Sequence, residues 1–130
     1  MKKILFLLLI SGALLATSCT KNYAVIPNQT IYANLTPSNW ATADTGKNYT
    51  TTISPQPGSN FGSSSSGIII YFTFDGGKTY EQIPEVYNNV SFSYTVTGGL
   101  ITLYAQSANG AQAITAPVAL TAKIVLVPSS

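Results

Sequence analysis

The chain offers few side chains that could carry out catalysis. It contains no histidine and a single cysteine, so Cys–His and Ser–His nucleophile pairs and the commonest metal ligands are missing. Among its four acidic residues, Glu81 and Glu85 could form a glycosidase pair only if their carboxyl groups lay about 5–10 Å apart across a cleft. The alternative is that both are solvated surface charges. We expect the alternative, and therefore a protein that is not an enzyme and has no catalytic residue, metal site or cofactor.

The charge balance argues against nucleic acid as a partner. The net charge of +2 comes from Lys2 and Lys3 in the first segment, and without them the remaining lysines balance the acidic residues. Binding to phosphate backbones requires several clustered cations. The scattered lysines of this chain do not supply such a cluster.

Aromatic side chains are abundant: one tryptophan, eight tyrosines and five phenylalanines. Exposed rings can bind sugars or proteins through their apolar faces, but strands also use aromatic residues for packing. We expect Trp40, Phe92 and Tyr94 to belong to the core. The alternative is glycan recognition, with Trp40 as a possible contact.

Two predicted strands are apolar on both faces. In 68–74 one face carries Ile68, Ile70, Phe72 and Phe74, and the other carries Ile69 and Tyr71. In 120–127 one face carries Ala122, Ile124 and Leu126, and the other carries Val125 and Val127. One face of each strand must be core, so the other face could form an exposed patch that marks contact with a partner. The predicted patch consists of Ile69, Tyr71, Tyr104, Val125 and Val127. The alternative, which stays open, is that long loops cover these residues.

After residue 30 the sequence reads as strands separated by turn residues. Apolar residues do not recur there at the spacing of a helix. Residues 90–97 alternate apolar and hydroxyl side chains, followed by Gly98-Gly99 and a second apolar run, which predicts a hairpin. We expect further strands at 31–35, 47–53, 68–74, 79–83 and 120–127, with long loops at 54–67 and 105–119. About seven strands in one domain predict an all-β fold, an antiparallel immunoglobulin-like β-sandwich.

The first segment has the features of an export signal: Lys2 and Lys3, an apolar run over 4–15, and small residues before Cys19. The run is too short to span a bilayer as a helix. Leu14-Leu15-Ala16-Thr17-Ser18-Cys19 resembles the bacterial lipobox, in which the cysteine receives a lipid. The alternative is cleavage by ordinary signal peptidase, which would release a soluble protein.

The resemblance to a lipobox implies a membrane anchor through lipid on Cys19. It divides the chain into a signal peptide (1–18), a lipidated N-terminus and tether (19–30) and a sandwich domain (31–130). It also implies a place on the cell envelope, at the outer membrane. Thr20-Lys21-Asn22 lacks the acidic run that surface-exported lipoproteins of this kind tend to carry, so we expect the periplasmic face, although the leaflet stays open.

The segment Thr73-Phe74-Asp75-Gly76-Gly77-Lys78-Thr79-Tyr80 resembles the Asp box, S-x-D-x-G-x-T-W, of sialidases and other propeller proteins. Physically the motif is a hairpin in which the aspartate can bond turn amides and the glycines accept positive φ. One degenerate copy in a chain too short for a propeller is expected to be only a turn.

A second resemblance extends over nearly the whole chain after the signal. It rests, in chain order, on Ser38-Asn39-Trp40, 49–53, 68–71, 80–84, Phe92 with Tyr94, Ile101 with Leu103, and 123–127. These segments resemble, in the same order, a pattern shared by small exported lipoprotein domains of Bacteroidetes: S-x-W, an aromatic-led strand, V-x-V-Y, a hairpin to L-P, an alternating aromatic strand, a short V-x-I strand and a closing K-V-V-V-I. The resemblance implies a β-sandwich without a known activity. We therefore expect a non-enzymatic envelope lipoprotein with a structural or protein-binding role, the alternative being a carbohydrate-binding module.

Overall fold

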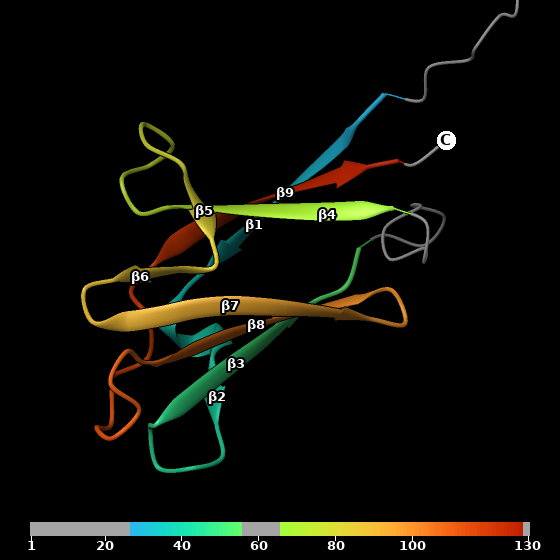
Figure 1. Cartoon of the computed structure of the whole chain (residues 1–130). Helices are drawn as coiled ribbons and strands as arrows, with labels where there is room; N and C mark the ends of the chain where they lie inside the picture. Colours follow the sequence, from blue (N-terminus) through green and yellow to red (C-terminus); the bar gives the residue numbers. More distant parts are fainter. Residues whose placement is uncertain (1–26, 56–65, 129–130) are drawn as a thin grey trace, which may run out of the picture.

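The computed structural model describes residues 27–55 and 66–128, which form two antiparallel β-sheets packed face to face (Figure 1). Sheet A has the strand order β1-β9-β4-β5, and sheet B has the order β2-β3-β8-β7-β6. The predicted antiparallel β-sandwich is therefore confirmed. The described residues contain nine strands rather than about seven, because two short strands, β2 and β6, had no clear sequence pattern.

The strands follow the chain in this order: β1 (Gln29–Leu35), β2 (Ala41–Thr42), β3 (Asn48–Ile53), β4 (Gly67–Thr73), β5 (Glu81–Ile83), β6 (Glu85–Tyr87), β7 (Val90–Thr97), β8 (Leu100–Ser107) and β9 (Leu120–Val127). A single 3₁₀ turn, η2 (Pro37–Asn39), links β1 to β2. Within the described ranges, no helix is long and apolar enough to cross a membrane.

Alternation along the strands determines which side chains enter the core. In β9 every second residue from Leu120 is buried, and in β4 the buried Ile70 and Phe72 lie on one face. Phe92 from β7 and Leu103 from β8 enter from sheet B. A period of two places successive side chains on opposite faces, so each sheet contributes one apolar face to a shared interior. The prediction that one face of 68–74 and one face of 120–127 form part of the core is confirmed.

Two-residue hairpin turns set the register of sheet B. Gly98 and Gly99 join β7 to β8 with φ of 56° and 80°, as the sequence predicts. Asn88 and Asn89 join β6 to β7 with φ of 47° and 62°. Such turns need positive φ at both central residues, which glycine and asparagine accept at the lowest cost.

A side-chain hydrogen bond joins the two sheets. The hydroxyl of Tyr94, on β7 of sheet B, donates to the carbonyl oxygen of Ile68, on β4 of sheet A, at 2.6 Å. The short strand β5 pairs with β4 only over Ile70–Phe72, so Ile68 lies beyond that pairing. Burial raises the pKa of the Tyr94 hydroxyl above its ordinary value of 10.0.

The first and last described strands are neighbours. β1 pairs with β9 over its whole length, with Gln29 opposite Leu126 and Leu35 opposite Leu120. The predicted start of the domain at residue 31 is two residues late, because the backbone of Gln29 and Thr30 already pairs with β9. The predicted loop at 105–119 begins later than expected, since β8 continues to Ser107.

Several sequence predictions lie outside the described residues. They are the signal peptide (1–18), Cys19 with most of the tether, and the greater part of the predicted loop at 54–67.

Candidate functional site

The outer face of sheet A brings together four of the five residues of the predicted patch. Ile69 lies directly opposite Val125, and Tyr71 is the next residue of β4 on the same face. Val127 lies opposite Gly67 at the end of β9. All four side chains are half-exposed. Because β4 and β9 are adjacent and their inner faces form the core, these outer residues share one surface.

Lys123 lies in the middle of this surface between aromatic rings. Its backbone pairs with Tyr71 on one side and with Tyr32 on the other. Its Nζ lies 5.8 Å from the ring centre of Tyr71 and 5.1 Å from that of Tyr80, within the range of cation–π attraction. Tyr32 is 60% exposed. We call Tyr32, Ile69, Tyr71, Lys123, Val125 and Val127 the sheet A surface.

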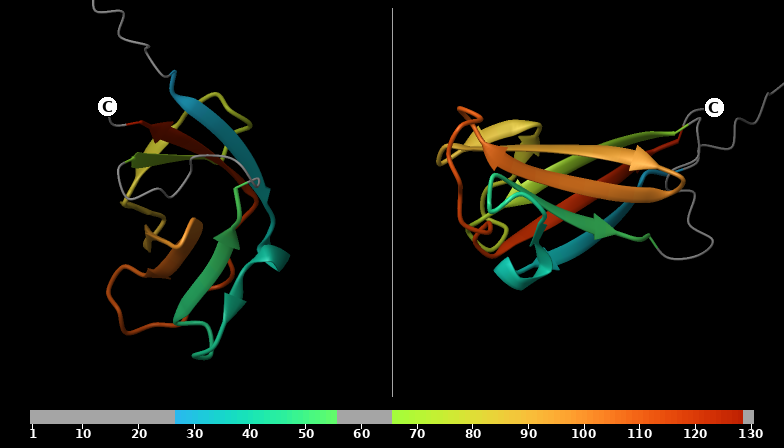
Figure 2. Two further views of the ribbon diagram at one scale, coloured as in Figure 1. Left: turned by 90° about the vertical axis from the view of Figure 1, so that its right-hand side faces the viewer. Right: turned by 90° about the horizontal axis from the view of Figure 1, so that it is seen from below.

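Tyr104 does not belong to this surface, and the prediction that grouped it with the other four is wrong. It lies on β8 between Thr50 of β3 and Ser93 of β7, on the outer face of sheet B. The two outer faces look in opposite directions because the sheets pack through their inner faces (Figure 2). Alternation within a strand indicates which residues share a face, but it does not indicate to which sheet the strand belongs.

Trp40 is a core residue, so the alternative that placed it in contact with a glycan is wrong. Its side chain is 6% exposed, and its ring centre lies 6.4 Å from that of Phe92. The 3₁₀ turn η2 ends at Asn39 and directs the next residue into the interior beside sheet B. The companion prediction, which assigned Trp40, Phe92 and Tyr94 to the core, is confirmed for Trp40 and Phe92, whereas Tyr94 is partly buried and packs against the core.

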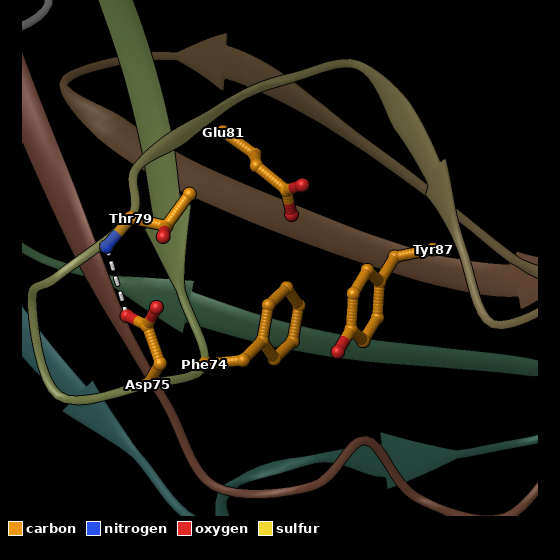
Figure 3. Close-up of a pocket in the computed structure, with 5 residues that line it drawn as sticks. All are labelled: Phe74, Asp75, Thr79, Glu81 and Tyr87. Atoms are coloured by element: carbon orange, nitrogen blue, oxygen red, sulfur yellow. Dashed lines mark hydrogen bonds between the residues drawn. The ribbon is translucent and has the colours of Figure 1, made fainter.

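A cavity of about 260 Å³ opens between the sheets near β5 and β6 (Figure 3). Its wall consists of Phe74, Asp75, Thr79, Glu81 and Tyr87. The rings of Phe74 and Tyr87 stack in parallel, with ring centres 4.2 Å apart and an interplanar angle of 6°. The stacked pair also lines a second cavity of about 150 Å³, which is bounded by residues 115–118 of the connection to β9.

Glu81 and Glu85 lie near this cavity but do not share it. Glu81 lines the wall, whereas Glu85 is not among the lining residues. Burial raises the pKa of the Glu85 carboxyl, and the neighbouring Glu81 raises it further. One carboxylate oxygen of Glu85, Oε1, is buried without a hydrogen-bond partner among the described residues. Both side chains are half-buried, so neither is the fully solvated surface charge that we expected.

The segment that resembles an Asp box forms a tight turn between β4 and β5, as predicted. The hydroxyl of Thr73 donates to Asp75 Oδ1 at 2.8 Å, and the N–H of Gly77 donates to the same threonine hydroxyl at 2.9 Å. The N–H groups of Lys78 and Thr79 donate to Asp75 Oδ1 at 3.0 and 2.9 Å. These hydrogen bonds lower the pKa of Asp75 from 3.8 to about 2, and the largest effects come from the N–H of Thr79 and then from the hydroxyl of Thr73.

A second turn, between β2 and β3, has the same bonds. The hydroxyl of Thr42 donates to Asp44 Oδ1 at 3.0 Å and accepts the N–H of Gly46 at 3.0 Å. The N–H groups of Lys47 and Asn48 donate to Asp44 Oδ1 at 3.1 and 2.8 Å. The expectation of one such turn is therefore wrong. The sequence signal was present, because 42–49 and 73–80 both have the pattern T-x-D-x-G-K-x-Y.

These bonds keep both aspartates occupied within their own turns. The carboxylate of each accepts backbone N–H groups from the residues that follow it, which is the role of an Asx turn. Each aspartate therefore stabilises the turn that contains it. Within residues 27–55 and 66–128, no group of three or more acidic, histidine or cysteine side chains is placed to hold a metal ion.

We compared the chain with protein-family models, with curated proteins and with solved structures. None of them matches. The resemblance to exported lipoprotein domains of Bacteroidetes therefore stays a sequence prediction.

Proposed function

We propose that this chain is a lipid-anchored protein of the bacterial cell envelope whose sandwich domain binds a partner protein through the sheet A surface. The lipobox resemblance at Cys19 supports the anchor, and the surface around Lys123 supports the binding role.

The observation that carries the binding role is the composition of the sheet A surface. Tyr32 and Tyr71 flank Lys123 across neighbouring strands, and Ile69 packs opposite Val125 in the next row. Tyrosine combines a large apolar ring with a hydroxyl, and exposed tyrosines are enriched at the centres of protein interfaces. Half-exposed aliphatic side chains beside such rings form the apolar part of a contact.

The charge of this surface indicates the chemistry of the partner. β1, β4 and β9 contain no acidic residue, and Lys123 is the only charged residue in these three strands. The single acidic residue of β5, Glu81, faces the cavity between the sheets instead. A partner that brings apolar side chains and one carboxylate would satisfy both the rings and the ammonium group.

The binding role is tested by photo-crosslinking in the native host. A photoreactive phenylalanine replaces Tyr71 in one variant and Val118 in a control, since Val118 is exposed but lies outside the sheet A surface. We expect a discrete adduct from position 71 and none from position 118, and Lys123→Glu should lower the yield of the adduct. Equal labelling at both positions, or no adduct at position 71, would refute the binding role.

The anchor is tested separately. The full chain should fractionate with membranes and carry acyl chains on Cys19, whereas Cys19→Ala should lose both properties. Recovery of wild-type protein in the soluble fraction, with a free thiol at its N-terminus, would refute the anchor and leave the binding role intact.

A further inference from the structure

The outer face of sheet B has a composition unlike that of the sheet A surface. β3, β8 and β7 lie side by side (Figure 2, right), and none of the three contains a charged residue. Their register aligns the outward side chains in rows across the sheet. One row consists of Thr52, Thr102 and Thr95, and the next of Thr50, Tyr104 and Ser93. The result is a grid of hydroxyl groups around one aromatic ring.

The ring of Tyr104 is held across this grid. Its hydroxyl lies 3.2 Å from Oγ1 of Thr95, which is the diagonal neighbour on β7 rather than the directly opposite Ser93. Diagonal neighbours on adjacent strands are within reach of an aromatic side chain. This contact ties the end of the ring to β7 and orders Tyr104 at the centre of the grid.

We infer that this face binds a neutral polysaccharide. Each threonine or serine hydroxyl can donate and accept a hydrogen bond, which matches the hydroxyl groups of a sugar chain. The apolar face of a sugar ring can lie on the ring of Tyr104. The grid is several strands wide and open, so it suits an extended chain better than a small enclosed ligand.

The composition of the face disfavours the other classes of ligand. An anionic polymer or nucleic acid would need cations, and β3, β7 and β8 have none. A stable protein interface normally has an apolar centre, whereas the residues around Tyr104 are hydroxylated. This inference does not depend on the sheet A proposal, since the two faces share no residue.

The test is affinity electrophoresis of the full chain in mild detergent, in native gels that contain dextran, mannan, laminarin or arabinoxylan. We expect at least one of these neutral polymers to retard the wild-type protein. Tyr104→Ala should weaken that retardation about tenfold, which corresponds to ~1.4 kcal/mol. Val118→Ala, at an exposed position outside both faces, should migrate like the wild type. Ser93→Arg, which adds bulk and charge beside the ring, should also abolish the retardation.

Other outcomes would overturn the inference. They are a lack of retardation by all four neutral polymers, retardation only by charged polymers such as heparin or polygalacturonate, and a Tyr104→Ala variant that binds like the wild type. A change in oligomeric state caused by Tyr104→Ala would also overturn it, because the face would then be a contact between copies of the chain. Circular dichroism of each variant separates lost binding from lost folding.

Discussion

Removing the hydroxyl of Tyr94 tests whether one hydrogen bond between the sheets stabilises the sandwich. Tyr94→Phe keeps the ring in place against the core and deletes only the group that donates to the carbonyl of Ile68 at 2.6 Å. Tyr104→Phe is a matched control, since its hydroxyl makes a longer contact of 3.2 Å with Thr95 within one sheet.

The expected magnitude follows from the surroundings of the two hydroxyls. A neutral hydrogen bond contributes about 0.5–1.5 kcal/mol net, and the carbonyl of Ile68 loses its partner in a half-buried place. We therefore expect Tyr94→Phe to lower the free energy of unfolding by ~1 kcal/mol. For a domain of about 100 residues this is a fall in Tm of about 4–8 °C. In Tyr104→Phe water replaces an exposed contact, so the change should stay within about 0.5 kcal/mol.

The assay is thermal and urea unfolding of both variants, followed by circular dichroism. The pH dependence gives a second readout. Because burial raises the pKa of Tyr94 in the folded chain, its contribution is fully present below about pH 10 and is lost as the pH rises through the raised value. The difference between wild type and Tyr94→Phe should therefore shrink above pH 10. Equal stabilities of Tyr94→Phe and Tyr104→Phe at pH 7 would refute the role of this bond.

Three further predictions concern the core and the twin turns. Phe72→Ala removes a fully buried ring that lies 5.3 Å from that of Phe92, and it should cost about 3–5 kcal/mol in urea unfolding; a loss below 1 kcal/mol would contradict the packing described. Since the pKa of Asp75 is about 2 in the folded chain, its stabilising effect is present above pH 3.8 and is lost as the pH falls through 2. The Tm of wild type should therefore exceed that of Asp75→Asn at pH 5 and approach it at pH 2, and a constant gap would argue against the turn bonds. Gly46→Ala should lower the Tm more than Gly76→Ala. Both glycines have positive φ, but only a Cβ added at Gly46 would lie 3.1 Å from a backbone oxygen, that of Ile114. Equal decreases in Tm would show that the backbone around Ile114 shifts to accommodate the added Cβ.

The sequence was sufficient to predict the strands with a strong alternating pattern. Residues 90–97 and 120–127 form β7 and β9 with the predicted bounds. Residues 90–97 have an uninterrupted period of two, and 120–127 are a mostly apolar run that ends before Pro128. β6 was missed because three residues are too short to show a period, although the Asn88-Asn89 pair after it is a typical hairpin turn.

The candidate surfaces were only partly predictable. Ile69, Tyr71, Val125 and Val127 could be grouped, because the two strands that carry them are both apolar on two faces and lie side by side in sheet A. The hairpin of β7 and β8 was predicted, but the position of Tyr104 also depends on the long-range pairing of β8 with β3, which a local pattern does not contain. The burial of Trp40 was predicted from its residue type, whereas its contact with Phe92, far along the chain, was not.

The pairing of β1 with β9 also governs the order in which the molecule can fold. Gln29 finds its partner only when Leu126 is available, close to the last residue of the chain. Pairing across such a long sequence separation is slow, because the entropy of closing the loop must be overcome before the contacts form. Sheet A therefore cannot close before β9 is available to pair with β1 on one side and with β4 on the other. The strands of sheet B can pair earlier, so closure of sheet A is expected to be a late step in folding.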